Sequence, residues 1–332
     1  MQAVENALKP MSFDDVAALA RDDMQAVDDL IRMSLATDVG LVSQVSEYIV
    51  MSGGKRLRPL IVLLASRALG YEATQHRRAA AIIEFIHTAT LLHDDVVDAS
   101  ARRRGRDSAN AVFGNQASVL VGDFLYSRAF QMMVDIDSMR IMHILADATN
   151  TIAAGEVMQL MNVHDPDVSE ASYREVIYRK TARLFEAGAQ LSAILAGSGA
   201  NVEAAMVEYG RHLGCAFQLV DDALDFGASP DELGKNLGDD LAEGKPTLPL
   251  IHAMSVGTSE ERRMIREAIV GGGLGRLADI QSVIESTGAL QYTAARAQEA
   301  ADLAIGALAD IPDSDYKQAL ITIADFAVRR RS

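Results

Sequence analysis

The sequence lacks most of the features that mark secreted, membrane-spanning or nucleic-acid-binding proteins. It has one cysteine, Cys215, which excludes an intrachain disulfide and fits a reducing compartment, so we expect a cytoplasmic protein. No apolar run approaches the ~20 residues of a membrane span. The first residues, MQAVENALKPMSFDD, have neither the basic start of a secretory signal nor the acid-poor composition of a transit peptide. The net charge of −15 argues against nucleic acid as a partner.

Proline is also scarce, at 7 of 332 residues, whereas 49% of the residues are hydrophobic. This composition favours helices and a large core, and no segment shows the alternation of a strand. We therefore predict an all-α fold, taken as a single domain over residues 1–332. The spacing of apolar residues predicts helices at 12–51 (two), 58–70, 79–98, 117–134, 138–162, from 172 to about 197, at 202–226, and about four between 250 and 331. Residues 227–246 form a long charged loop, of a length that compact domains usually keep for binding or for a lid.

Two acidic clusters with the same spacing end two of the predicted helices. They are Asp94, Asp95 and Asp98, and Asp221, Asp222 and Asp225. Residues four apart share a helix face, where like charges destabilise each other unless a cation lies between them. Mg²⁺ prefers such oxygen ligands, so we predict that both clusters bind Mg²⁺. A single cluster is also compatible with a solvated helix end, but two copies are harder to explain in that way.

Basic residues flank both clusters. They would explain how a protein with a net negative charge binds an anionic substrate. Arginine binds phosphate in a bidentate manner, and lysine binds it as a point charge. Each of these residues alone is compatible with a solvated surface side chain, but together they indicate an anion site. The set comprises Lys55, Arg56, Arg58, Arg103, Arg104, Lys180, Lys235 and Lys245.

The motifs HDDVVD, RRRG, KTARLF, FQLVDDALDF, GKNLGDD and GKPTLP together resemble those of trans-isoprenyl diphosphate synthases, more narrowly the long-chain, octaprenyl-type enzymes. The resemblance extends from about residue 53 to residue 331. One departure lies after the first acids, where Ala99, Ser100 and Ala101 fill a gap that often holds further acids and Arg102 adds a third arginine.

The resemblance implies a helical bundle around a deep central cavity, a homodimer, and Mg²⁺-dependent addition of isopentenyl diphosphate to an allylic diphosphate, giving a product of about C40 for quinone side chains. It also implies peripheral membrane contact for release of the product. The roles it implies are metal binding by Asp94, Asp95, Asp98, Asp221, Asp222 and Asp225; allylic diphosphate binding by Arg103, Lys180, Lys235 and Lys245; isopentenyl diphosphate binding by Lys55, Arg58, His87 and Arg104; and stabilisation of the carbocation by Thr181 and Gln218. Without the resemblance, His87 could equally be a partnered core side chain.

Helix geometry makes a separate prediction about product length. Side chains lean toward the N-terminus of a helix, so a prenyl chain held at Asp94 should pass Thr90 and Ala89, then Ile86, then Ile83. Each helical turn cleared opens about 5 Å, on the order of one isoprene unit. Ala89 and Thr90 are small, which favours a long product, although a small Ala89 could instead serve close helix packing.

Four other readings remain open from the sequence. A synthase of shorter or longer products would share these motifs. A terpene cyclase shares the first acidic cluster but normally lacks the second. A non-catalytic subunit of a heteromeric synthase should have lost acids or arginines, and none is missing here. A purely structural acidic bundle would give no purpose to the basic set.

Overall fold

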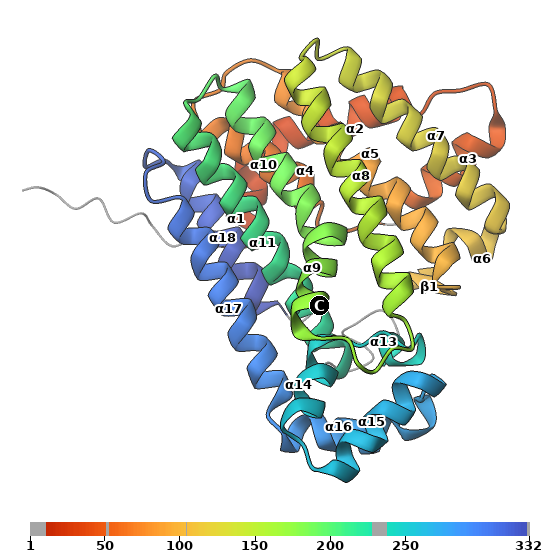
Figure 1. Ribbon diagram of the computed structural model, residues 1–332. Helices are drawn as coiled ribbons and strands as arrows, with labels where there is room; N and C mark the ends of the chain where they lie inside the picture. Colours follow the sequence, from red (N-terminus) through yellow and green to blue (C-terminus); the bar gives the residue numbers. More distant parts are fainter. Residues whose placement is uncertain (1–10, 51–52, 104, 228–237, 331–332) are drawn as a thin grey trace, which may run out of the picture.

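The protein is described by a computed structural model covering residues 11–50, 53–103, 105–227 and 238–330 (Figure 1). Apart from one short β-hairpin, the regular elements in these ranges are helical, which confirms the predicted all-α class. The elements of the first half are α1 (Phe13–Leu19), α2 (Arg21–Ser34), α3 (Gly40–Val50), α4 (Leu57–Ala68), α5 (Gln75–Val97), β1 (Arg102–Arg103), β2 (Arg106–Asp107), α6 (Ala109–Phe113), α7 (Asn115–Val134) and α8 (Met139–Asn162). Those of the second half are α9 (Glu170–Ile177), η1 (Tyr178–Ala182), α10 (Arg183–Leu195), α11 (Ala200–Gly227), α13 (Asp239–Ala242), α14 (Leu248–Val256), α15 (Ser259–Gly271), η2 (Leu274–Arg276), α16 (Leu277–Ser286), α17 (Ala289–Ala307) and α18 (Asp315–Arg329).

Helix α5 lies inside the bundle, as Figure 1 shows, and packs against α2, α4, α7 and α10. Its Ala, Ile, Phe and Leu side chains are buried on several faces, which is why the sequence shows a long apolar helix rather than an amphipathic one. Helix α11 packs mainly against α10 and α17. The C-terminal ends of α5 and α11 open on one cavity, so the packing of these two helices brings the two acidic motifs together.

Three predicted boundaries differ from the structure. Residues 12–50 form three helices instead of two, because a capping box at Ser12 starts the separate helix α1. Ser169, rather than Ser172, caps α9, and its side chain accepts the backbone N–H of Ser172. The long helix predicted from Ser172 is also interrupted by η1, a π-helical turn of five residues.

The elements after α11 close the bundle at one end. Helices α14, α15 and α16 lie together at the lower end in Figure 1, while α18 packs against α17, α4 and α11. Half of the predicted loop 227–246, residues 228–237, lies outside the described residues, but the remainder contains the short helix α13. Among the described helices, none has both the length and the apolar character that crossing a membrane requires.

Candidate active site

Two of the three acids of the first cluster line a cavity of 360 Å³, and the third points away from it. Asp94 and Asp98, one turn apart at the end of α5, lie in the cavity wall. Asp95 is completely buried, and its carboxylate faces Arg103, whose Nη2 is 2.6 Å from Oδ1 and whose Nε is 3.0 Å from Oδ2. The structure therefore makes Asp95 the partner of an arginine that itself lines the cavity.

The second cluster is divided in the same way. Asp221 lines the 360 Å³ cavity from α11. Asp222 is buried, and it accepts hydrogen bonds from Tyr173 and Gln218. Asp225 is also buried and accepts the backbone N–H of Asp240 at 3.2 Å. Of the six acids predicted to bind metal, the structure thus places Asp94, Asp98 and Asp221 around the cavity.

Each of these three acids faces a cationic side chain. Lys180 Nζ is 3.5 Å from Asp94 Oδ2, and Lys245 Nζ is 2.9 Å from Asp98 Oδ2. Among the described residues, no group of three or more His, Cys, Asp or Glu side chains is already gathered as a metal site. The acids are instead spread around the cavity. This arrangement fits Mg²⁺, which is usually held by one or two carboxylates together with waters and substrate phosphates rather than by a complete protein cage.

The third cation is Arg330, at the end of the described chain. Its Nη2 is 2.7 Å from Asp221 Oδ1 and donates to the backbone oxygen of Phe217 at 2.6 Å. The guanidinium also lies 3.7 Å from the centroid of the Phe217 ring, and only 6% of the side chain is exposed. The structure thus places Arg330 in contact with a cavity-lining acid.

Two further acids were not predicted by sequence reasoning. Glu156 of α8 lines the cavity and lies 2.6 Å from Lys180 Nζ. Burial raises the pKa of Glu156 to about 7, with the charge of Asp94 acting in the same direction and Lys180 opposing it. Asp240 of α13 also lines the cavity. Glu156 lies in the middle of a helix without a motif, whereas Asp240 belongs to the GKNLGDD segment and could have been found there.

Of the residues predicted to bind isopentenyl diphosphate, the structure brings Arg58 and His87 together. Arg58 Nη1 is 3.1 Å from His87 Nε2, and both residues line the 360 Å³ cavity. The Arg58 guanidinium lies 4.4 Å from the centroid of the Phe185 ring, which holds it against an apolar surface. Lys55 lies outside that lining, over the Phe326 ring, and burial together with the nearby charge of Arg330 lowers its pKa. Arg104 and Lys235 lie outside the described residues.

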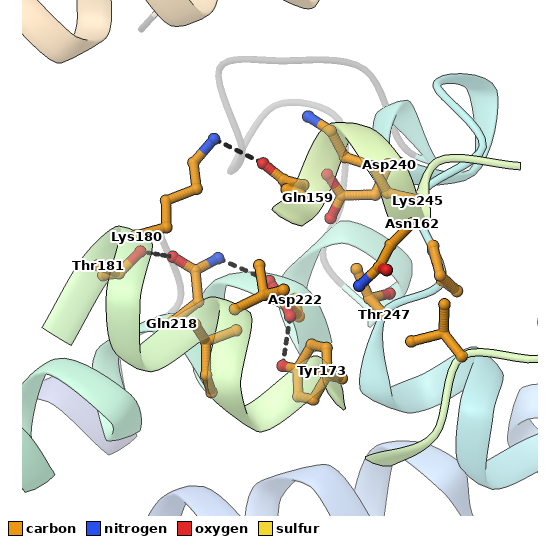
Figure 2. Close-up of a pocket in the computed structure, with 14 residues that line it drawn as sticks. Gln159, Asn162, Tyr173, Lys180, Thr181, Gln218, Asp222, Asp240, Lys245 and Thr247 are labelled. Atoms are coloured by element: carbon orange, nitrogen blue, oxygen red, sulfur yellow. Dashed lines mark hydrogen bonds between the residues drawn. The ribbon is translucent and has the colours of Figure 1, made fainter. Parts of the chain in front are cut away.

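The π-helical turn η1 carries Lys180 and Thr181 (Figure 2). Thr181 donates a hydrogen bond to Gln218 Oε1 at 2.8 Å, and Lys180 donates to Gln159 at 2.6 Å. Glycine in α8 allows the close approach of the two backbones, because a Cβ on Gly155 would lie 2.8 Å from the backbone nitrogen of Lys180. A π-helical turn inside a helix is often found at a functional site.

A second cavity, of 770 Å³, lies between α5, α7 and α8 and shares Thr90, Asp94, Ile152 and Glu156 with the first. Its wall otherwise includes apolar and aromatic side chains such as Tyr126 and Phe130. Of the four residues predicted to measure product length, only Thr90 lines it. The other three, Ala89, Ile86 and Ile83, are completely buried in the core and line neither of the two cavities, because the inner face of α5 is covered by neighbouring helices.

The site therefore combines a polar cavity, with acids and cations at the ends of α5 and α11, and an adjoining, larger apolar cavity. Such a pair of cavities suits a lipid-like substrate with a charged head and a hydrocarbon chain. The chain matches the family model for polyprenyl synthetase over residues 39–287 and belongs to that family. It is a prenyltransferase, as the sequence motifs predicted.

Relatives with assigned names match nearly the whole chain. It is 54% identical to octaprenyl diphosphate synthase of Escherichia coli K12, over 96% of this chain and 99% of that protein. It is 46% identical to the all-trans-nonaprenyl-diphosphate synthase (geranyl-diphosphate specific) of Rhodobacter capsulatus, over 95% and 97% of the two chains. Among solved structures, a polyprenyl synthase from Caulobacter crescentus CB15, complexed with calcium and isoprenyl diphosphate, superposes with a TM-score of 0.94 at 45% identity, covering 98% of this chain and 99% of that one.

Proposed function

We propose that this protein is a long-chain all-trans polyprenyl diphosphate synthase that adds isopentenyl diphosphate repeatedly to an allylic diphosphate, for which we assign farnesyl diphosphate, to give a product of about C40. The observation that carries the proposal is the convergence of Asp94, Asp98 and Asp221 on a cavity that also contains Arg58, Lys180 and Lys245. The identity to octaprenyl diphosphate synthases supports the product length.

Mg²⁺ fits the cavity because the three acids offer carboxylate oxygens there. We assign metal binding to Asp94, Asp98 and Asp221, and leave Asp95, Asp222 and Asp225 out of the ligand set because their carboxylates are buried in other contacts. When bound, the metal would neutralise charge on the diphosphate leaving group. Calcium in the Caulobacter crescentus structure supports a divalent cation in this family.

The side chains of the protein itself divide into three roles. Lys180, Lys245 and Arg103 hold the allylic diphosphate next to the acids, while Arg58 and His87 hold isopentenyl diphosphate. Lys55 lies close enough to Arg330 for the charges of the two side chains to interact. The oxygens of Thr181 and Gln218 face the positive charge that forms when the allylic C–O bond breaks, which is electrostatic stabilisation. Released pyrophosphate takes the proton that is lost after the new C–C bond forms.

We further infer that residues 1–332 form one domain, that the protein acts as a cytoplasmic homodimer, and that its product serves quinone synthesis after peripheral contact with a membrane. Support for the dimer comes from α7, where large apolar side chains remain exposed in the single chain: Leu120 at 67%, Val134 at 63% and Phe130 at 39%. Exposed apolar patches of this kind commonly mark an interface between proteins.

A second candidate is a synthase of nine or ten isoprene units, because relatives include the nonaprenyl synthase above and a decaprenyl diphosphate synthase structure from Rhodobacter capsulatus with a TM-score of 0.91 at 42% identity, covering 96% of this chain and 99% of that one. Reversed-phase chromatography of the dephosphorylated product separates these lengths from C40.

The test of the proposed function is an assay of purified protein with Mg²⁺, labelled isopentenyl diphosphate and farnesyl diphosphate. Asp94→Asn and Asp221→Asn should each lower turnover by roughly a hundredfold, as expected for lost electrostatic stabilisation. Asp302→Asn is the matched control, since this α17 residue lines neither cavity. A wild-type protein without product would identify a non-catalytic subunit, and near-normal rates in both variants would refute the assignment of the acids.

A further inference from the structure

Figure 2 shows a chain of hydrogen bonds from Thr181 through Gln218 and Asp222 to Tyr173, along a small pocket of 70 Å³. Thr181 Oγ1 donates to Gln218 Oε1 at 2.8 Å, and Gln218 Nε2 donates to Asp222 Oδ1 at 2.7 Å. Tyr173 donates its hydroxyl hydrogen to Asp222 Oδ2 at 2.5 Å. All four residues line this 70 Å³ pocket, and Thr181 and Gln218 also line the 360 Å³ cavity.

We propose that Tyr173 and Asp222 are positioning residues for the reaction, which fix the orientation of the Gln218 amide and, through it, that of the Thr181 hydroxyl. This inference rests on the proposed function, in which Thr181 and Gln218 face the developing carbocation. It gives Tyr173 a role that no motif suggested, and it makes Asp222 a hydrogen-bond acceptor for an amide.

The first step of the chain fixes the amide of Gln218. A side-chain amide can present either its oxygen or its nitrogen to a neighbour. Asp222 Oδ1 accepts a hydrogen bond whether or not Oδ2 carries a proton, so the nitrogen of Gln218 must face Asp222 in both states. The amide oxygen is thereby turned toward Thr181.

The second step fixes the hydroxyl of Thr181. A threonine hydroxyl has one hydrogen, and here it is donated to the Gln218 oxygen. The lone pairs of Thr181 Oγ1 are then available to the cavity that this residue lines. If the amide of Gln218 were reversed, its N–H would donate to Thr181, and the hydroxyl hydrogen would be free to point into the cavity, where it would oppose a cation.

Tyr173 and Asp222, at the far end of the hydrogen-bond network, are buried, which keeps the orientation of the Gln218 amide fixed. Tyr173 is 5% exposed and Asp222 3% exposed, so bulk water has little access to their hydrogen bonds. Tyr173 packs in an apolar cluster with Ile177, Leu219 and Leu248. A buried acceptor that loses its donor has no replacement close by, and hydrogen bonds to charged groups are stronger than neutral ones.

The experiment compares Tyr173→Phe with Tyr209→Phe in the full-length protein. Tyr209, a residue of α11, is the matched control because it is also a buried tyrosine. It donates to the backbone oxygen of Leu320 at 2.9 Å and lines neither cavity. Tyr173→Phe should lower kcat about tenfold with the KM of both diphosphates unchanged, because the Asp222 carboxylate loses the donor that holds it in place against Gln218. Tyr209→Phe should leave kcat unchanged, although both variants lower the melting temperature. Equal kcat values for the two variants would overturn the proposal.

A double-mutant cycle identifies the route of the effect. If Tyr173 acts through Gln218, Tyr173→Phe should cause no further loss of kcat in a Gln218→Ala background. Losses that multiply in the double variant would contradict the proposal. If Gln218→Ala itself has normal kcat, the assignment of Gln218 in the proposed function fails instead, so the two failures are distinguishable.

Asp222→Asn provides a second variant that does not remove the tyrosine. Its oxygen can still accept from Gln218, and its nitrogen can donate to the Tyr173 oxygen, so the amide orientation is kept. Asp222→Asn should therefore retain kcat within about threefold and an unchanged dependence on Mg²⁺, while Asp222→Leu should lose tenfold or more. A hundredfold loss in Asp222→Asn with a raised Mg²⁺ requirement would show a metal ligand and refute the positioning role.

Discussion

Thr90 is the position at which product length should respond most directly to a change of side chain. It lines both the polar cavity and the 770 Å³ apolar cavity, and it lies one helical turn before Asp94. One turn is about 5 Å along the helix, on the order of one isoprene unit. In α8, the wall of the larger cavity continues from Glu156 back to Thr149, a further ~10 Å. Thr90 therefore lies where the larger cavity joins the polar one.

We predict that Thr90→Phe leaves the enzyme active but shortens its product to roughly three or four units, because the ring fills the passage about one turn from the diphosphate. The measurement is reversed-phase chromatography of the dephosphorylated products. Thr90→Val is the control, since it keeps the volume of the side chain and should keep the product length. An active Thr90→Phe enzyme with unchanged products would show that the chain does not pass this residue.

The sequence predicted that the prenyl chain passes Ala89 as well as Thr90, so Ala89→Tyr is the other substitution that would be expected to block it. Ala89 is completely buried in the core in this structure, so a tyrosine there would overpack the bundle at a cost of about 1–3 kcal/mol or more. We therefore expect loss of stability to precede any effect on chain length at that position.

Two further predictions concern support of the fold and of the site. Asp23 accepts hydrogen bonds from Arg67 and Arg77, which outweigh burial and hold its pKa well below the usual range. Asp23→Asn should lower the free energy of unfolding by about 2 kcal/mol at neutral pH, and the loss should disappear as the pH falls from about 4 toward that lowered pKa; a constant difference in urea melts down to pH 2 would contradict this. Gly155→Ala should lower kcat about tenfold by displacing Lys180, whereas Gly306→Ala, with open space around it, should not; equal steady-state rates would show that the close approach is unimportant.

The class of fold was accessible from the sequence because long, proline-poor apolar segments between glycines have few alternatives to helix. The candidate site could be predicted from the sequence only in part. The spacing of Asp94 and Asp98 places them on one face, and the structure confirms that both face the cavity. The same pattern could not show that Asp95 points into a buried contact with Arg103, since that depends on the fold of the loop after α5.

Other residues of the site were not predicted from the sequence for a similar reason. Glu156 and Tyr173 lie on α8 and α9, where neither belongs to a repeated motif, and only tertiary packing brings them toward α5 and α11. Helix periodicity also cannot tell a cavity wall from a packed interface, because both require apolar or small side chains. This is why periodicity could not show that Thr90 lies in a cavity wall whereas Ala89, Ile86 and Ile83 lie in the packed core.

The pairing of Asp94 with Lys180, Asp98 with Lys245 and Asp221 with Arg330 has a consequence for the order of events at the site. In the ligand-free protein these cations serve as the counter-ions of the acids, so a divalent metal must compete with them for the same oxygens. A diphosphate draws the cations toward itself and leaves the carboxylates to the metal. On the proposed function, metal and substrate would therefore favour each other's binding by the same factor, as thermodynamic reciprocity requires.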